Sequence, residues 1–167
     1  MSNTQENLES AFAGESQASR RYLFFAEKAE KEGQPRIARL FRAAAEAETV
    51  HARNHLEAMD GIGSTKDNLG EAIGGESYEF TEMYPGFIEQ AESENNKRAR
   101  VSFGYANEVE KIHHGLYQKA LGDLESGQQL KDEPYFVCQV CGNTVEGEAL
   151  ERCPVCGAPR SKFKQVE

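Results

Sequence analysis

The stretch AEAETVHARNH, from Ala45 to His55, decides how this chain folds. Apolar residues around it recur at steps of three and four, the spacing of one helical face, and they are Ile37, Leu40, Phe41, Ala44, Ala52 and Met59. Glu48, His51 and His55 lie in the same stripe. An ionised carboxylate in a helical core costs several kcal/mol unless an opposite charge pairs with it. The pattern therefore predicts a compensating cation, and we expect a metal ion.

The composition excludes several classes of protein. A chain of 167 residues, with 38% hydrophobic and 9% aromatic residues, is long and apolar enough to fold around a core. Its 19 basic and 28 acidic residues leave a net charge of -9, which argues against binding to nucleic acid or to anionic membranes. The sequence shows no export leader and no apolar run of about 20 residues, so we expect a cytoplasmic protein.

Four long helical patterns fill the first three quarters of the chain, over residues 4–32, 35–59, 65–92 and 94–124. Pro85, in MYPG, is expected to bend or interrupt the third pattern. Short connections make successive helices antiparallel neighbours, which predicts a four-helix bundle over residues 1–125. A polar linker is expected over 126–134, and the helical period is absent from 135–167, where we expect a small separate domain.

An internal repeat relates the two halves of this helical region. FAGES, at Phe12–Ser16, recurs as IGGES at Ile73–Ser77, and each copy is followed by an E-x-x-H motif. Glu15 precedes Glu48 by 33 residues, and Glu76 precedes Glu110 by 34. The conjunction predicts two helix pairs related by an approximate twofold axis.

Each of the four helices offers at least one glutamate on its apolar face, and two of them add a histidine; the set is Glu15, Glu48, His51, Glu76, Glu110 and His113. Carboxylate oxygen and imidazole nitrogen together suit iron or manganese, and an i, i+3 spacing aims both side chains at one point. Four carboxylates balance two divalent ions. The arrangement matches dinuclear carboxylate bundles, in which two helices carry Glu and two carry Glu-x-x-His.

Other polar residues of the stripes are assigned lesser roles. A single E-x-x-H motif is usually a solvated pair, and only the coincidence of two with matching glutamates favours metal. His55 and His114 are interpreted as surface residues or as partners of the ligands. Tyr22 and Tyr84 are interpreted as core aromatics whose hydroxyl groups could hydrogen-bond a ligand carboxylate.

The last thirty residues carry two C-x-x-C pairs, formed by Cys138, Cys141, Cys153 and Cys156. A glycine follows each pair, and the spacing predicts a tetrahedral site for one metal ion. Zinc would make the domain structural, whereas iron would make it a one-electron carrier. The identity of the ion stays open on spacing alone.

Several motifs together resemble the rubrerythrin family over essentially the whole chain: FAGESQASRRY, AEAETVHA, GGESYEFTEMYPGF, EVEKIHHGLY and CQVCG with CPVCG. The resemblance implies a mainly α fold, with a ferritin-like four-helix bundle followed by a rubredoxin-like domain. It implies two iron ions in the bundle, one iron on the four cysteines, and Glu79 as a seventh ligand that exchanges with His51 as the centre changes oxidation state. Asn143 departs from the family pattern, because rubredoxin-like modules often carry an aromatic residue there.

The resemblance also implies an activity and its partners. The expected reaction is the reduction of hydrogen peroxide to water, a protection against oxidative stress, with electrons from a donor protein or an NAD(P)H-dependent reductase. The expected assembly is a head-to-tail homodimer in which the tail of one chain faces the bundle of the other. Iron oxidation and handling, catalase-like disproportionation and a zinc-stabilised interaction module are the alternatives that the sequence leaves open.

Overall fold

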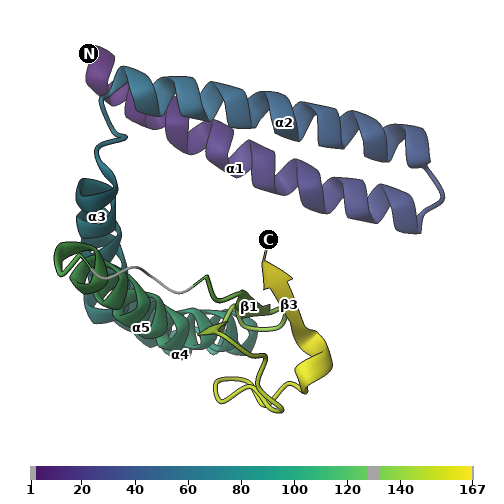
Figure 1. Ribbon diagram of the computed structural model, residues 1–167. Helices are drawn as coiled ribbons and strands as arrows, with labels where there is room; N and C mark the ends of the chain where they lie inside the picture. Colours follow the sequence, from purple (N-terminus) through teal and green to yellow (C-terminus); the bar gives the residue numbers. More distant parts are fainter. Residues whose placement is uncertain (1–2, 128–131, 167) are drawn as a thin grey trace. The chain divides into compact units, whose positions relative to one another are not determined.

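The structure is a computed structural model that describes residues 3–127 and 132–166, and its two compact units are Met1–Gly63 and Ser64–Glu167 (Figure 1). The fold class is mainly α with a small C-terminal strand region, as the sequence predicts. Among the described residues, no helix combines the length and the apolar character that crossing a membrane requires.

The first unit is a hairpin of two long helices, α1 (Thr4–Lys31) and α2 (Pro35–Ala58), which lie side by side in Figure 1. Asn3 and Glu6 form a capping box that starts α1. The turn between the helices uses Gly33, whose φ of 72° is accessible to glycine without strain, and Pro35 opens α2. Both helices therefore begin and end close to their predicted limits.

The seam between α1 and α2 is built from small side chains. Its buried members are Ser19, Ala26 and Ala29 on α1 and Ala38, Ala45 and Ala52 on α2. The α1–α2 seam leaves other members of the apolar stripe of α2 uncovered, since Ile37 is 47% exposed and Leu40 68%. A pair of helices covers only one narrow seam on each member, so the wider stripe remains on the surface of the pair.

The helices of the second unit are α3 (Thr65–Tyr78), a π-helix η1 (Glu79–Met83), α4 (Tyr84–Ser93) and α5 (Lys97–Glu125). The predicted interruption exists, but it begins at Glu79 and not at Pro85. The amide of Tyr84 donates to the carbonyl of Glu79, five residues back, which is the hydrogen-bond spacing of a π-helix. The last helix begins three residues later than predicted, where Asn96 caps it.

The π-helix accommodates one residue that the first repeat lacks. Tyr22, Phe25 and Phe41 form an aromatic cluster with ring centroids 5.5–6.3 Å apart, and Tyr84, Phe87 and Phe103 form one with the same range of distances. Tyr22 lies seven positions after Glu15, whereas Tyr84 lies eight positions after Glu76. The additional residue of the second repeat therefore lies within η1, where the wider π-helical turn accommodates it.

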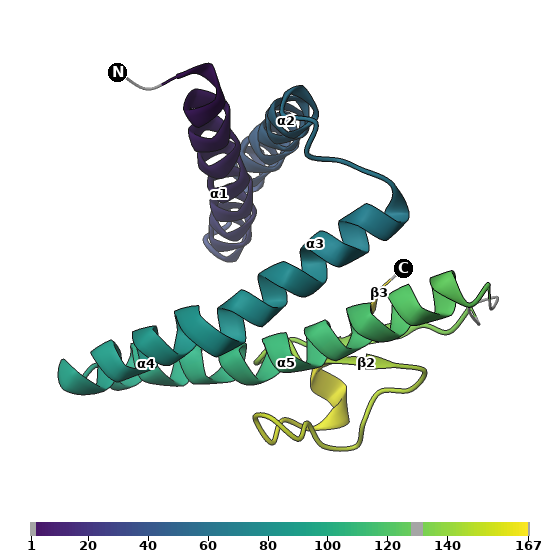
Figure 2. The same ribbon diagram turned by 90° about the vertical axis from the view of Figure 1, so that its left-hand side faces the viewer.

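The C-terminal residues form a three-stranded antiparallel sheet in the order β2-β1-β3, with β1 at Tyr135–Cys138, β2 at Thr144–Glu146 and β3 at Phe163–Val166. We call residues 135–166 the cysteine module. It lies along α5 in Figure 2. Lys119 of α5 pairs with Glu146, and a Cβ atom placed on Gly142 would lie 3.7 Å from the buried Val109. Module and helix thus belong to one packed unit.

Candidate metal centres

The first unit brings together Glu15 from α1 and Glu48 and His51 from α2, with one potential ligand atom of each within 4.8 Å of the others. The Nδ1 atom of His51 lies 2.8 Å from Glu48 Oε2 and 3.9 Å from Glu15 Oε1. Helical i, i+3 spacing explains the first contact, and the hairpin supplies the second. The side chain of His51 is 53% exposed in this unit, although its position in the apolar stripe predicts burial.

The second unit repeats this group with Glu76 from α3 and Glu110 and His113 from α5. The Nδ1 atom of His113 lies 2.7 Å from Glu110 Oε2 and 3.8 Å from Glu76 Oε1. These three side chains are more buried than their counterparts, and that of His113 is 28% exposed. The repeat found in the sequence is therefore a repeat of geometry as well.

Burial and mutual repulsion perturb the acids of the second group. Burial, followed by the charge of Glu110, raises the pKa of Glu76 to about 7. The hydrogen bond to Glu110 raises the pKa of His113 against the opposing effect of burial. Carboxylates that repel one another in a partly buried site are a cost that a bound cation removes.

Glu79 and Tyr84 flank the second group. Glu79 lies outside the set of three ligand atoms, but burial and then the charge of Glu110 raise its pKa. Burial and then the charge of Glu79 raise the pKa of the Tyr84 phenol. Both residues stand at the ends of the π-helix, so the wide turn sets how they face the carboxylates.

The remaining candidates lie outside the two groups. The ring of His114 packs edge-on against Phe80 at a centroid distance of 5.4 Å, and His55 lies in the last turn of α2. Tyr22 packs against Phe25 and Phe41, as its interpretation as a core aromatic predicts.

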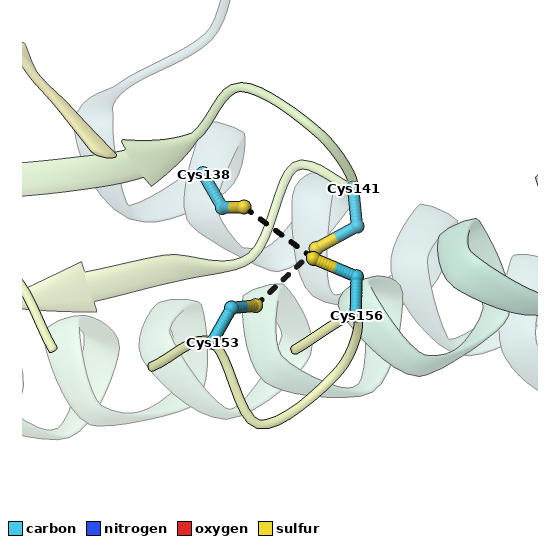
Figure 3. A group of neighbouring side chains, drawn as sticks. All are labelled: Cys138, Cys141, Cys153 and Cys156. Carbon is cyan, nitrogen blue, oxygen red and sulfur yellow. Dashed lines mark hydrogen bonds between the residues drawn. The ribbon is translucent and has the colours of Figure 1, made fainter. Parts of the chain in front are cut away.

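The four cysteines converge in the cysteine module, where their thiols form no disulfide (Figure 3). The Sγ atoms of Cys138 and Cys156 are 3.7 Å apart, and those of Cys141 and Cys153 are 3.5 Å apart. A tetrahedron with metal–sulfur bonds of about 2.3 Å has edges of about 3.8 Å. The sulfur atoms are therefore spaced as ligands of a single ion.

Two matching turns hold these cysteines. Gly142 and Gly157 have φ angles of 88° and 75°, and their amides donate to the carbonyls of Cys138 and Cys153 at 2.8 and 2.9 Å. Burial alone would raise the pKa of the Cys153 thiol, but backbone amides of Cys156 and Val155 bond to the sulfur and lower the pKa to about 7. These amides stabilise thiolate, the form that binds metal.

Asn143 and Thr144 are the residues whose roles the sequence does not reveal. Asn143 is buried, with 1% exposure, so it occupies an interior position of the module although it is not aromatic. The Oγ1 atom of Thr144 lies 2.9 Å from Nε2 of His113. These two residues are 31 positions apart and belong to different predicted domains, so no local sequence pattern predicts their contact.

The donor sets fit the metals that the sequence predicts. Oxygen with imidazole nitrogen suits iron in the two carboxylate groups, and four sulfur atoms at tetrahedral spacing suit one iron or zinc ion. Each carboxylate group offers two glutamates, the charge that balances one divalent ion, and an ion bound at the second group would offset the repulsion between Glu76 and Glu110.

Comparison with known proteins agrees with these donor sets. The family model described as rubrerythrin matches residues 6–121, and that described as the rubredoxin-like domain of rubrerythrin matches residues 136–164. The chain is 39% identical to rubrerythrin-2 of Clostridium acetobutylicum, covering 96% of this chain and 95% of the relative. It is 36% identical to rubrerythrin of Porphyromonas gingivalis, covering 99% and 91%.

A solved structure of nigerythrin in its fully reduced, all-ferrous state is 34% identical to the chain. Its match covers 99% of this chain and 88% of that one, with a TM-score of 0.58. The chain thus belongs to the rubrerythrin family, oxidoreductases whose cofactors are a di-iron centre held by carboxylate and histidine ligands and one iron ion held by four cysteines.

Proposed function

We propose that this protein is a cytoplasmic peroxidase that reduces hydrogen peroxide to water and so protects against oxidative stress. Each peroxide takes up two electrons and two protons and yields two water molecules. One observation carries the proposal: a four-cysteine site packs on α5, the helix that presents Glu110 and His113. An electron carrier beside a carboxylate group serves a reaction that consumes external electrons, whereas iron storage has no evident need for it.

The proposed division of the chain is a bundle over 1–125, a linker over 126–134 and an electron-carrying domain over 135–167. The proposed ligands of the di-iron centre are Glu15, Glu48, His51, Glu76, Glu79, Glu110 and His113. Those of the single iron ion are Cys138, Cys141, Cys153 and Cys156. When bound, the di-iron centre supplies the two electrons that break the O–O bond.

Two side chains beside the second group have proposed roles: Tyr84 is a hydrogen-bond donor, and Glu79 is an additional carboxylate. The phenol of Tyr84 is a hydrogen-bond donor, and burial and nearby carboxylates raise its pKa above its ordinary value. Glu79 is the carboxylate that can meet an increase in positive charge, and the exposed His51 is the neutral ligand that can leave. We propose that these two residues exchange as the charge of the centre changes.

The proposed partners are a donor protein or an NAD(P)H-dependent reductase and a second copy of the chain. The resemblance implies that the tails serve opposite chains of a head-to-tail homodimer. The contacts of α5 with the cysteine module of the same chain support electron transfer within one chain instead. Mixing a Cys138→Ser chain with a His113→Gln chain separates the two arrangements, because activity returns only if tails serve opposite chains. We expect no recovery.

An anaerobic experiment tests the peroxidase function. The iron-loaded protein is fully reduced, one equivalent of hydrogen peroxide is added, and the visible spectra of both iron centres and the dissolved oxygen are followed. We expect rapid oxidation of the di-iron centre, then of the cysteine iron, without oxygen release. Oxygen release would identify disproportionation, and a cysteine iron that stays reduced would contradict the electron relay.

A further inference from the structure

Thr144 lies at the start of β2, and the function proposed above does not use it. Its Oγ1 atom has two partners, the carbonyl oxygen of Gly142 at 3.1 Å and the Nε2 atom of His113 at 2.9 Å. The side chain is partly buried between the cysteine module and α5. A hydroxyl group of the electron-carrying module therefore touches the imidazole of a proposed ligand of the other metal centre.

The direction of these two hydrogen bonds follows from the chemistry of their atoms. A hydroxyl group has one hydrogen to donate, and the carbonyl of Gly142 can only accept. If the hydroxyl donated to His113 instead, two oxygen atoms would face each other as acceptors at 3.1 Å. All three groups are satisfied when Thr144 donates to Gly142 and accepts from the Nε2–H of His113.

We propose that Thr144 is a positioning residue for the di-iron centre, which accepts the Nε2–H of His113 and thereby turns Nδ1 toward Glu76 and Glu110. The inference rests on the proposed role of His113 as an iron ligand. A ligand imidazole whose second nitrogen is bound by a fixed acceptor keeps one ring orientation and one tautomer. In this chain that acceptor comes from the domain that binds the other metal.

Contacts on both sides of Thr144 hold the hydroxyl in place. One turn of α5 before His113, the buried Val109 faces Gly142, and farther along the helix Lys119 pairs with Glu146. The position of Thr144 is further fixed by β-sheet pairing with Val137. The hydroxyl is thus part of the packed face of the module and not the tip of a free loop.

The placement couples the two metal centres. A module of this size, with few buried apolar residues, depends on its metal ion for folding, because binding and folding are linked in small metal domains. Metal on the four cysteines therefore orders Thr144, and Thr144 orders His113. The coupling is reciprocal, so metal in the bundle also favours the docked module.

A pair of substitutions at this position tests the inference in the full-length chain. Thr144→Val keeps the shape of the side chain and removes the hydroxyl, and Thr144→Ser keeps the hydroxyl. Each is loaded with zinc, which is diamagnetic, and the histidine ¹⁵N–¹H spectrum is recorded. We expect a slowly exchanging Nε2–H signal of His113 in the original chain and in Thr144→Ser, and its loss in Thr144→Val.

Thr49→Val is the matched control, because it removes a hydroxyl bonded to Ser19 and Ala45 in the α1–α2 hairpin without touching a histidine. Its His113 signal should be unchanged. The inference is overturned if Thr144→Val retains the Nε2–H signal, or if Thr144→Ser loses it. Thr144→Ser also keeps the test decisive should Thr144→Val fail to fold.

Metal affinity gives a second measurement. Loss of a hydrogen-bond partner of a ligand typically weakens metal binding by roughly 10- to 100-fold, and we expect about tenfold for Thr144→Val at the bundle centre, with the cysteine centre loaded normally. Equal affinity in the original chain and Thr144→Val would overturn the inference. If the original chain shows the Nε2–H signal but reduces no peroxide, the proposed function fails and the positioning role of Thr144 stands.

Discussion

The two carboxylate–histidine groups of this chain have almost the same inner geometry and different surroundings. The imidazole Nδ1 lies 2.8 and 3.9 Å from its two glutamates in the first group, and 2.7 and 3.8 Å in the second. Outside these contacts the groups diverge. His113 is 28% exposed and held at Nε2 by Thr144. His51 is 53% exposed, and across residues 3–127 and 132–166 no hydrogen bond reaches its Nε2 atom.

This difference teaches that a repeated motif repeats the potential ligand atoms but not the contacts that surround them. Of the two proposed ligands, His113 must break a hydrogen bond at Nε2 as well as its contacts at Nδ1 in order to move, whereas His51 must break only its contacts at Nδ1. The second group also contains the π-helix and its additional carboxylate, Glu79. The second group is thus the more buried and the richer in carboxylates, and the proposed exchange involves the histidine of the first group.

The largest effect is expected when the second group alone loses the contact between Thr144 and His113. Cys138→Ser should abolish metal binding at the cysteine site, where the metal is worth on the order of 10 kcal/mol of folding free energy to a small module. Thr144 then loses its position. We expect steady-state peroxide reduction to stop, while a chemically reduced di-iron centre still reacts once with peroxide. Stopped-flow spectroscopy and steady-state assays measure the two rates.

Gln139→Ala, in the same turn but without a metal-binding atom, is the control for this substitution. It should keep both the cysteine-site spectrum and turnover. Normal turnover in a Cys138→Ser chain that lacks metal at the cysteine site would contradict the electron relay.

The next effect compares the two histidines directly. His113→Gln removes a proposed ligand whose ring is already held at Nε2 by Thr144, whereas His51→Gln removes a proposed ligand that is 53% exposed. We expect His113→Gln to lower the affinity of the bundle for ferrous iron about tenfold more than His51→Gln does. Competition with a chelator of known affinity measures both. Equal losses would mean that the anchor at Thr144 contributes nothing to binding.

A smaller effect concerns the π-helix. Deleting Thr81 restores the seven-residue spacing of the first repeat between Glu76 and the following tyrosine, so we expect a continuous α-helix and a turned-away Glu79. Peroxide turnover should fall to that of Glu79→Gln, with iron content retained. Pro85→Ala keeps the extra residue and should keep the π-helix, changing stability by about 1 kcal/mol or less. A π-helix that survives the deletion in a crystal structure would refute this origin.

Much of this comparison could be predicted from the sequence, because helical spacing is local. The period of the apolar residues predicts the helices, and the two E-x-x-H motifs predict both groups that the structure brings together. The π-helix also left a signal, since separations of 33 and 34 residues between equivalent glutamates differ by one. Pro85 predicts only an interruption of the helix, whereas the inserted residue explains the wide turn.

The contact between His113 and Thr144 could not be predicted in this way. It joins residues of two domains across the linker, and its geometry depends on how the cysteine module packs along α5. The exposure of His51 has a similar origin. Periodicity shows which face of a helix is apolar, but the area that is covered depends on the neighbouring elements of the fold.

The smallest expected effect is a pH dependence that the more buried group imposes on the metal-free protein. The pKa of Glu76 is about 7 in the folded chain and near 4.5 when the carboxyl is solvated, so between these values only the folded state holds the proton. Stability therefore falls as pH rises from 4.5 to 7. His113, whose pKa is also raised, contributes in the same direction. Urea unfolding at pH 5, 6, 7 and 8 measures the decline.

Glu76→Gln should remove the part of this decline that belongs to Glu76 and leave the part that belongs to His113, so its curve should be flatter but not level. An unchanged slope would show that Glu76 is ionised throughout the range. Bound metal reverses the sign of this pH dependence of stability. A cation replaces the proton at Glu76, and it binds more tightly as pH rises. Above neutral pH the ionised form of Glu76 therefore destabilises the metal-free protein and is also the form that binds a cation.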